Sequence, residues 1–299
     1  MTSAVSIRDV CKSYGDFKAV DSLSLDVDRG SIFGLLGPNG AGKTTTIRMI
    51  VNINLPDSGS VSVLGEPASP RLQHRIGYLP EERGLYKKMR VREQLLFLSG
   101  LKGVGIDESR RRIAFWAERL KIADWLEKKT NELSKGMQQK IQFIATILHK
   151  PELIILDEPF SGLDPVNTSL LIEVIHELRA EGATIILSTH VMEQVEKLCD
   201  DICLINKARK VLGGSLRDIK RDYGIKKIAL DFEGDDTFLQ DSAVTSIDRF
   251  ASHIEAHISQ PEDAQRLLRK AVESGVQIRK FELVQPSLHE IFVVKVGTN

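Results

Sequence analysis

The sequence contains few cysteines and no long apolar run. It has three cysteines, Cys11, Cys199 and Cys203. So small and odd a number of cysteines does not indicate a disulfide framework. C-x-x-x-C without partner histidines is a poor zinc pattern, so we expect small apolar side chains packed inside a cytosolic protein. No apolar run approaches the ~20 residues that cross a bilayer, and residues 1–9 lack the features of a secretion signal. If the protein works at a membrane, another chain spans it.

The sequence also lacks an excess of charge of either sign. Lys plus Arg and Asp plus Glu both number 41, so the formal net charge is zero. Binding to nucleic acid needs a basic footprint, and we therefore expect no nucleic-acid partner. The hydrophobic content of 42% is ordinary for a globular protein, and a length of 299 residues allows about two domains.

One stretch has, at residues 37–44, the pattern G-x-x-x-x-G-K-[ST], which is typical of a phosphate-binding loop. It follows an apolar run at 32–36, and a helical pattern begins at about Lys43, near its end. The candidate nucleotide-binding residues of this stretch are consecutive: Gly37, Pro38, Asn39, Gly40, Ala41, Gly42, Lys43, Thr44 and Thr45. Glycines let backbone N–H groups form a positive nest, and the helix adds its free N–H groups. Lys43 can reach outer phosphates and Thr44 can ligate Mg²⁺. The alternative interpretation is that the glycines only form a tight turn. The expected strand at 32–36 and the expected helix from Lys43, however, have the positions that a nucleoside triphosphate site requires.

Strand and helix patterns alternate along most of the chain. Strands are expected at 5–10, 22–27, 60–65, 76–80, 153–156 and 184–188, and helices at 43–51, 135–149 and from Asp164-Pro165 to Gly182. This alternation indicates an α/β fold with a mainly parallel sheet, antiparallel N-terminal strands and a helical insert at about 88–145. Tryptophans and phenylalanines at helical spacing in the insert are expected in its core; the alternative is a docking face for a partner.

The character of the sequence changes after residue 214. We expect a first domain at 1–215, a linker at 216–225 with the pattern of a polar helix and a breaker, and a small α+β domain at 226–299. The elements expected in that domain are strands at 227–232, 253–259 and 277–283, a helix at 261–274 and an amphipathic piece at 287–296.

Further polar residues stand where they could serve the phosphate loop. Asp157 and Glu158 follow a buried strand, where one carboxylate can hold Mg²⁺ and the other can deprotonate a water; the alternative is a pair that caps the next turn. Ser134 and Gly136 at a helix start form a second anion site, unless Ser134 is only an N-cap. His190 follows the strand at 184–188 and could contact a terminal phosphate, although a lone histidine is usually structural.

These segments, in this order, resemble the nucleotide-binding subunit of an ABC transporter over residues 5–215. The resemblance implies a P-loop ABC ATPase core in which Tyr14 stacks on adenine. Lys43 and Thr44 belong to the Walker A motif, Asp157 is the Mg²⁺ carboxylate and Glu158 is the catalytic base. The cofactors implied are ATP and Mg²⁺.

The same resemblance assigns residues to contacts between subunits. Ser134 and Gly136 belong to the signature motif that touches ATP held by a second copy of the chain, and Asp164 belongs to the D-loop. His190 resembles the switch histidine. The implied partners are that second copy and an integral membrane permease subunit, with this chain peripheral on the cytoplasmic face of the membrane.

Two departures from the family pattern affect this interpretation. Lys135 and Met137 replace the usual residues of the signature motif, while the phosphate-contacting Ser134 and Gly136 remain. Glu81 stands where the family has a glutamine; it could ligate Mg²⁺, but a terminal phosphate would repel it, and a carboxylate only accepts hydrogen bonds. The coupling role of this position is therefore open, and slow turnover is one consequence.

Two short stretches narrow the resemblance to a subgroup. Residues 81–86 and 285–292 resemble bacterial exporter ATPases, sodium- and drug-export types among them, that carry a small C-terminal domain and serve an ABC-2 class membrane subunit. The expected function is ATP hydrolysis that powers export. The alternatives are a soluble ABC ATPase acting on ribosomes or DNA, and a regulatory module that hydrolyses ATP slowly with Glu81 as its brake.

Overall fold

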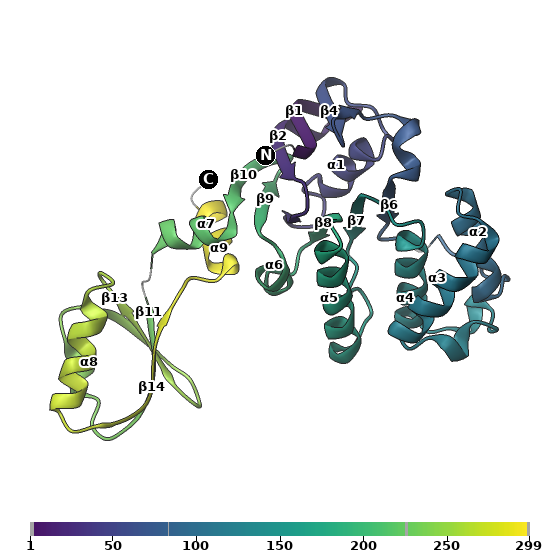
Figure 1. Cartoon of the computed structure of the whole chain (residues 1–299). Helices are drawn as coiled ribbons and strands as arrows, with labels where there is room; N and C mark the ends of the chain where they lie inside the picture. The colour runs from purple at the N-terminus through teal and green to yellow at the C-terminus, as the bar shows by residue number, and fades with distance from the viewer. Residues whose placement is uncertain (1–2, 83, 225–226, 298–299) are drawn as a thin grey trace. The chain divides into compact units, whose positions relative to one another are not determined.

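In the computed structural model the chain forms two compact units, Met1–Ser215 and Leu216–Asn299 (Figure 1). The structure describes residues 3–82, 84–224 and 227–297. Residues 225, 226, 298 and 299 of the expected linker and accessory domain lie outside the described residues, as does residue 83. Helix α7 (Leu216–Tyr223) occupies most of the expected linker and belongs to the second unit.

The first unit is built on a sheet with the strand order β10-β9-β3-β8-β7-β6. Its strands are β3 (Ile32–Leu36), β6 (Ile76–Leu79), β7 (Leu153–Asp157), β8 (Thr184–Thr189), β9 (Asp201–Asn206) and β10 (Arg209–Ser215). Neighbouring strands are parallel except for the edge strand β10, which pairs antiparallel with β9. β3, β7 and β8 are buried along their whole length, as expected for a parallel sheet covered on both faces. Their carboxyl ends therefore meet at one edge.

A second, antiparallel sheet precedes and follows the phosphate loop in sequence. It contains β1 (Ser3–Tyr14), β2 (Phe17–Asp28), β4 (Ser58–Val63) and β5 (Glu66–Pro67) in the order β2-β1-β4-β5. Its buried side chains join those of the central sheet in one core that includes Ile7, Leu23, Ile47 and Ile155. The antiparallel N-terminal strands and the mainly parallel sheet were both predicted and are confirmed.

Helices of the first unit cover the sheet and form the insert (Figure 1). They are α1 (Lys43–Ile50), α2 (Val91–Leu101), α3 (Ile106–Arg119), α4 (Lys135–Ile147), α5 (Pro165–Ala180) and α6 (Met192–Leu198), with 3-10 turns at Pro70–His74, Ala123–Trp125 and Thr130–Glu132. α2 packs against α3 and α4, and α4 also packs on β6. The expected helical insert is present, while β9, β10 and α6 were not predicted.

The aromatic residues of the insert differ in burial. Trp116 lies in the core, but Phe97 is 43% exposed and Phe115 is 60% exposed. The expectation that the phenylalanines pack in the core of the insert is wrong for these two. Periodicity identifies a shared helical face, but it does not show whether another element covers that face.

The second unit has its own sheet and core. Besides α7 it contains β11 (Lys227–Glu233), a 3-10 turn at Thr237–Gln240, β12 (Val244–Arg249), β13 (Ile254–Ile258), α8 (Asp263–Glu273), β14 (Gln277–Val284) and α9 (Leu288–Gly297). The sheet order is β12-β13-β11-β14, with antiparallel neighbours throughout. Leu267 of α8 packs with Ile228, Leu230 and Ala256 of the sheet. The α+β class was expected, but β12 was not.

The contact between β6 and α4 yields a stability prediction. A Cβ added at Gly77 would lie 2.4 Å from the backbone oxygen of Thr146, so Gly77→Ala must push α4 away from the sheet. We expect a loss of about 1–3 kcal/mol in the free energy of unfolding, measured by urea denaturation followed by circular dichroism.

A matched control is Gly100→Ala in α2, where an added Cβ meets no atom of the described residues within 4 Å. Alanine favours a helix over glycine by about 0.5–1 kcal/mol, so this variant should be slightly more stable than the wild type. A Gly77→Ala protein as stable as the wild type would contradict the packing described here.

Candidate functional site

The phosphate loop connects β3 to α1 and depends on glycine at two places. Gly37 has φ 148° and Gly42 has φ 112°, a region that side chains with a Cβ rarely adopt. A Cβ at Gly37 would lie 2.1 Å from the backbone oxygen of Ile205, and one at Gly42 would lie 2.3 Å from that of Ala19. The backbones of β9 and β2 therefore pack directly against the loop and leave no room for side chains at these two positions.

Lys43, the first residue of α1, folds back over this loop. Its Nζ donates to the backbone oxygens of Gly37 (2.7 Å) and Pro38 (3.2 Å). Burial lowers the pKa of Lys43, while the nearby carboxylates of Glu158, Asp157 and Glu81 act in the opposite direction. An anionic ligand in the loop would offer this buried cation stronger partners than neutral carbonyls.

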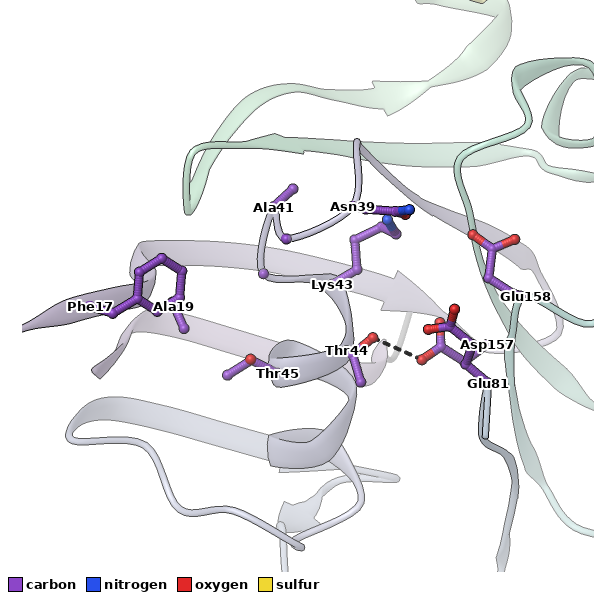
Figure 2. A pocket seen from close by; sticks show the side chains of 12 residues that line it. Phe17, Ala19, Asn39, Ala41, Lys43, Thr44, Thr45, Glu81, Asp157 and Glu158 are labelled. Carbon is purple, nitrogen blue, oxygen red and sulfur yellow. Dashed lines mark hydrogen bonds between the residues drawn. The ribbon is translucent and has the colours of Figure 1, made fainter. Parts of the chain in front are cut away.

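A hydroxyl and a carboxylate meet beside Lys43. The Thr44 Oγ1 donates to Asp157 Oδ2 at 3.0 Å, as Figure 2 shows. Asp157 is 1% exposed, and burial raises its pKa, an effect that the Thr44 hydroxyl and the Lys43 ammonium oppose. Hard oxygen donors of this kind are the ligands that Mg²⁺ prefers, and a cation would relieve the buried carboxylate. The donor set therefore fits Mg²⁺.

The next residue, Glu158, is held in place by the end of β8. It has φ 49°, and its N–H donates to the Ser188 oxygen at 2.9 Å. Its carboxylate accepts hydrogen bonds from Thr189 Oγ1 (3.0 Å) and from His190 N (3.0 Å), and His190 Nδ1 lies 2.6 Å from the same carboxylate. A non-glycine residue in this strained backbone region, fixed by several donors, is typical of a functional position. Thr189 was not predicted, although it directly precedes His190.

These groups line one cavity of about 370 Å³ (Figure 2). The lining residues are Phe17, Ala19, Asn39, Gly40, Ala41, Gly42, Lys43, Thr44, Thr45, Glu81, Asp157 and Glu158. In Figure 2 the carboxylates of Glu81, Asp157 and Glu158 lie on one side of Lys43 and Phe17 lies on the other. The cavity thus joins a cationic nest, an acidic wall and an aromatic ring.

The aromatic residue at this cavity differs from the one expected. Phe17, which sequence reasoning missed, lines the cavity and is 61% exposed. Tyr14 is not among the lining residues, and its hydroxyl accepts a hydrogen bond from Asn54 Nδ2 at 2.6 Å. Both rings flank the turn between β1 and β2, so a sequence signal existed only as two aromatics three residues apart. Adenine stacking on Tyr14 stays a prediction.

Ser134, Gly136 and Asp164 do not line this cavity. Ser134 caps α4, because its Oγ accepts from Met137 N at 3.3 Å, and Asp164 caps α5, because its carboxylate accepts from Asn167 N at 2.9 Å. A Cβ at Gly136 would lie 2.7 Å from the Gly162 oxygen, so the start of α4 packs closely on the loop before α5. The same chain does not bring these residues to its own phosphate loop.

Comparisons with known proteins identify the family. A family model described as ABC transporter matches residues 20–161, and one described as the C-terminal domain of DrrA1-3-like ATP-binding proteins matches residues 214–296. The chain is 48% identical over 294 residues to an uncharacterized ABC transporter ATP-binding protein, YhaQ of Bacillus subtilis (strain 168), with 98% of each chain covered. This chain belongs to the ABC transporter ATP-binding proteins. The resemblance seen in the sequence is confirmed, and the protein is an ATP-hydrolysing subunit of a transporter.

Other similar proteins agree with this assignment. This ABC transporter ATP-binding protein is 39% identical to the Nod factor export ATP-binding protein I of Burkholderia orbicola (strain AU 1054), over 71% of this chain and 70% of the relative. A solved structure described as the ATP binding subunit of an ABC transporter superposes with a TM-score of 0.70 at 32% identity, over 74% of this chain and 94% of that one. Among the described residues, no helix has both the length and the apolar character to span a membrane.

Lys43→Ala tests the loop of this ATP-binding protein. The change removes the charge-assisted hydrogen bonds that the Lys43 ammonium can give to phosphates, and we expect affinity for ATP to fall about 10- to 100-fold. Titration with a fluorescent nucleotide measures it. Arg110→Ala, at an exposed ion pair of α3, serves as the control with unchanged affinity. Equal affinities for the Lys43→Ala variant and the wild type would refute the phosphate contact.

Proposed function

We propose that this protein powers export by hydrolysing Mg-ATP on the cytoplasmic face of the membrane, in complex with a separate ABC-2 class membrane subunit. The observation that carries the proposal is the cavity in which Lys43, Thr44, Asp157 and Glu158 converge at the carboxyl ends of β3 and β7. The match to a DrrA-like C-terminal domain and the similarity to Nod factor export ATP-binding proteins support the direction of transport. No cargo is assigned.

Each part of the cavity has a role in the proposal. The loop residues 37–45 and Lys43 bind the phosphates, and Thr44 and Asp157 hold Mg²⁺, with Glu81 as a further oxygen ligand. Bound Mg²⁺ neutralises charge on the outer phosphates. An aromatic ring, Tyr14 or Phe17, stacks on the base.

Glu158 is proposed as the general base. Its carboxylate stands at the wall of the cavity and is oriented by the Thr189 hydroxyl and the His190 backbone. It can accept the proton of a water that attacks the terminal phosphate in line. The Nδ1 atom of His190 lies 2.6 Å from the Glu158 carboxylate, so Nε2 is the ring nitrogen that can make the proposed contact with the terminal phosphate.

The proposed working unit is a head-to-tail dimer. Ser134 is exposed at the start of α4 and lies outside the chain's own nucleotide cavity, as do Gly136 and Asp164. A second copy can use these groups to contact the triphosphate from the other side. ATP then stabilises the closed pair through contacts absent from the open pair, and hydrolysis removes them.

Glu158→Gln separates binding from chemistry. The amide keeps the shape of the side chain but cannot take the proton, so hydrolysis should fall about 10²- to 10⁴-fold while ATP binding persists. Phosphate release measures the loss, and light scattering with ATP should show a stable dimer. The control Glu181→Gln changes an exposed carboxylate at the end of α5 and should leave both unchanged. A Glu158→Gln protein that hydrolyses ATP at the wild-type rate would rule out this base.

The proposed contact with the membrane subunit lies on the helical insert. Tyr86 and Phe97 form an exposed edge-to-face ring pair, with centroids 5.8 Å apart, at the end of the loop that leaves the nucleotide cavity. Exposed aromatic pairs of this kind are enriched at protein interfaces. This position would let movement in the insert reach the membrane subunit.

Phe97→Asp tests this contact. Because Phe97 is 43% exposed, the change should leave folding and ATP binding intact. We expect it to abolish co-purification of the chain with its membrane subunit from solubilised membranes. Co-purification at the wild-type level would place the contact elsewhere.

One observation favours a second function, that of a slow regulatory module. Glu81 lines the cavity beside Asp157 and Glu158, which adds a negative charge where a terminal phosphate would lie. Phosphate release by the complex of this chain with its membrane subunit distinguishes the two functions. Turnover that the membrane subunit does not stimulate would favour the regulatory module.

A further inference from the structure

The loop between β6 and α2 is fastened by two buried glutamine side chains. Gln142 of α4 donates from Nε2 to the backbone oxygens of Pro80 and Glu82, both at 3.3 Å. Gln94 of α2 accepts the Tyr86 N–H at 2.5 Å. The Gln142 bonds fall on the residues immediately before and after Glu81. They therefore fix the backbone that places the Glu81 carboxylate in the nucleotide cavity.

Gln142 is costly to the fold at this position. It is 6% exposed, and its Oε1 has no hydrogen-bond partner among the residues that the structure describes. A buried polar atom without a partner destabilises the folded state, and an apolar side chain of similar volume avoids that cost. Stability alone therefore does not account for an amide here, whereas the two bonds to the loop do.

Gln142 also stands on the helix that begins at the signature segment. Ser134 and Gly136 lie at the start of α4, and Gln142 follows two helical turns later, about 10 Å along the axis. A hydrogen-bonded helix moves as a rigid element. A shift of the start of α4 is thus carried to the backbone on both sides of Glu81.

We infer that Gln142 is a positioning residue that couples the start of α4 to the placement of Glu81. The inference rests on the proposed function, in which a second copy's ATP engages Ser134 and Gly136. Gln142 is not among the residues that line the nucleotide cavity. When α4 moves as the pair closes, Gln142 draws the Pro80–Glu82 backbone with it and sets the distance of Glu81 from Asp157. A terminal phosphate repels the Glu81 carboxylate, so the placement of the Glu81 backbone decides how closely that carboxylate approaches the Mg²⁺ that Thr44 and Asp157 would hold.

A double-mutant cycle with Gln142→Met and Glu81→Ala tests the inference on the full chain. Methionine keeps the volume of glutamine but cannot donate to the loop. We expect Gln142→Met to change kcat for ATP hydrolysis about tenfold with KM within about twofold of the wild type. In the Glu81→Ala background the same change should alter kcat less than about twofold, because Gln142 acts through Glu81.

Two further variants distinguish a loss of coupling from a general packing defect. Gln142→Lys restores a donor of similar reach and should recover most of the wild-type kcat. If Gln142→Met fails to fold, Gln142→Leu, which also cannot donate to the loop, takes its place in the cycle. Gln73→Met removes another glutamine bond to a backbone oxygen, that of Val51 at the end of α1, and should leave kcat unchanged, because this bond does not touch the Pro80–Glu82 backbone.

The outcomes are distinct. A wild-type kcat in Gln142→Met, or an equal change in kcat in both backgrounds, overturns the coupling through Glu81. A rise in KM together with a lower melting temperature and no rescue by lysine also overturns it, since that pattern marks a packing defect. Absence of phosphate release from the wild-type chain overturns the proposed function itself, which is a different result.

Discussion

The register of three buried parallel strands determines where the chemistry of this protein lies. β8 pairs with β3 on one side and β7 on the other, so that Leu36 lies opposite Thr189 and Asp157 lies opposite Ser188. The phosphate loop, the carboxylate pair and His190 therefore leave the sheet at the same edge. Because a slip of one residue turns every side chain to the other face, the core that fixes this register also fixes the site.

The site is electrostatically unfavourable without a ligand. Burial lowers the pKa of Lys43 and raises that of Asp157, so the protein holds both charges where water solvates them poorly. A polyanion together with a divalent cation satisfies both groups at once. The same logic explains why the carboxylates gather on one side of Lys43, where a nucleotide's outer phosphates and metal would lie (Figure 2).

The sequence contained enough local information to predict the phosphate loop, the buried strands and the carboxylate pair, because each is a short pattern with its own chemistry. It did not reveal β12, because its two apolar residues, Val244 and Ile247, stand three apart across a shift in register and break the alternation that marks a strand. Nor did it reveal the contacts of Thr189 and Gln142, which exist only once distant segments meet. Phe97 and Phe115 were expected in the core because helical spacing does not show which face a neighbour covers. Phe17 was missed since Tyr14 fits the family pattern, whereas the cavity adjoins Phe17.

The proposed mechanism depends on each ATP being bound by the phosphate loop of one chain and by the start of α4 of another. Mixing two inactive variants, Lys43→Ala and Ser134→Glu, tests it most directly. In a head-to-tail pair that contains one copy of each variant, one nucleotide site carries both substitutions and the other site carries neither. We predict that the mixture regains about a quarter of the wild-type phosphate release, since half of randomly formed pairs are mixed and each has one intact site of two. A mixture no more active than either variant alone would contradict it.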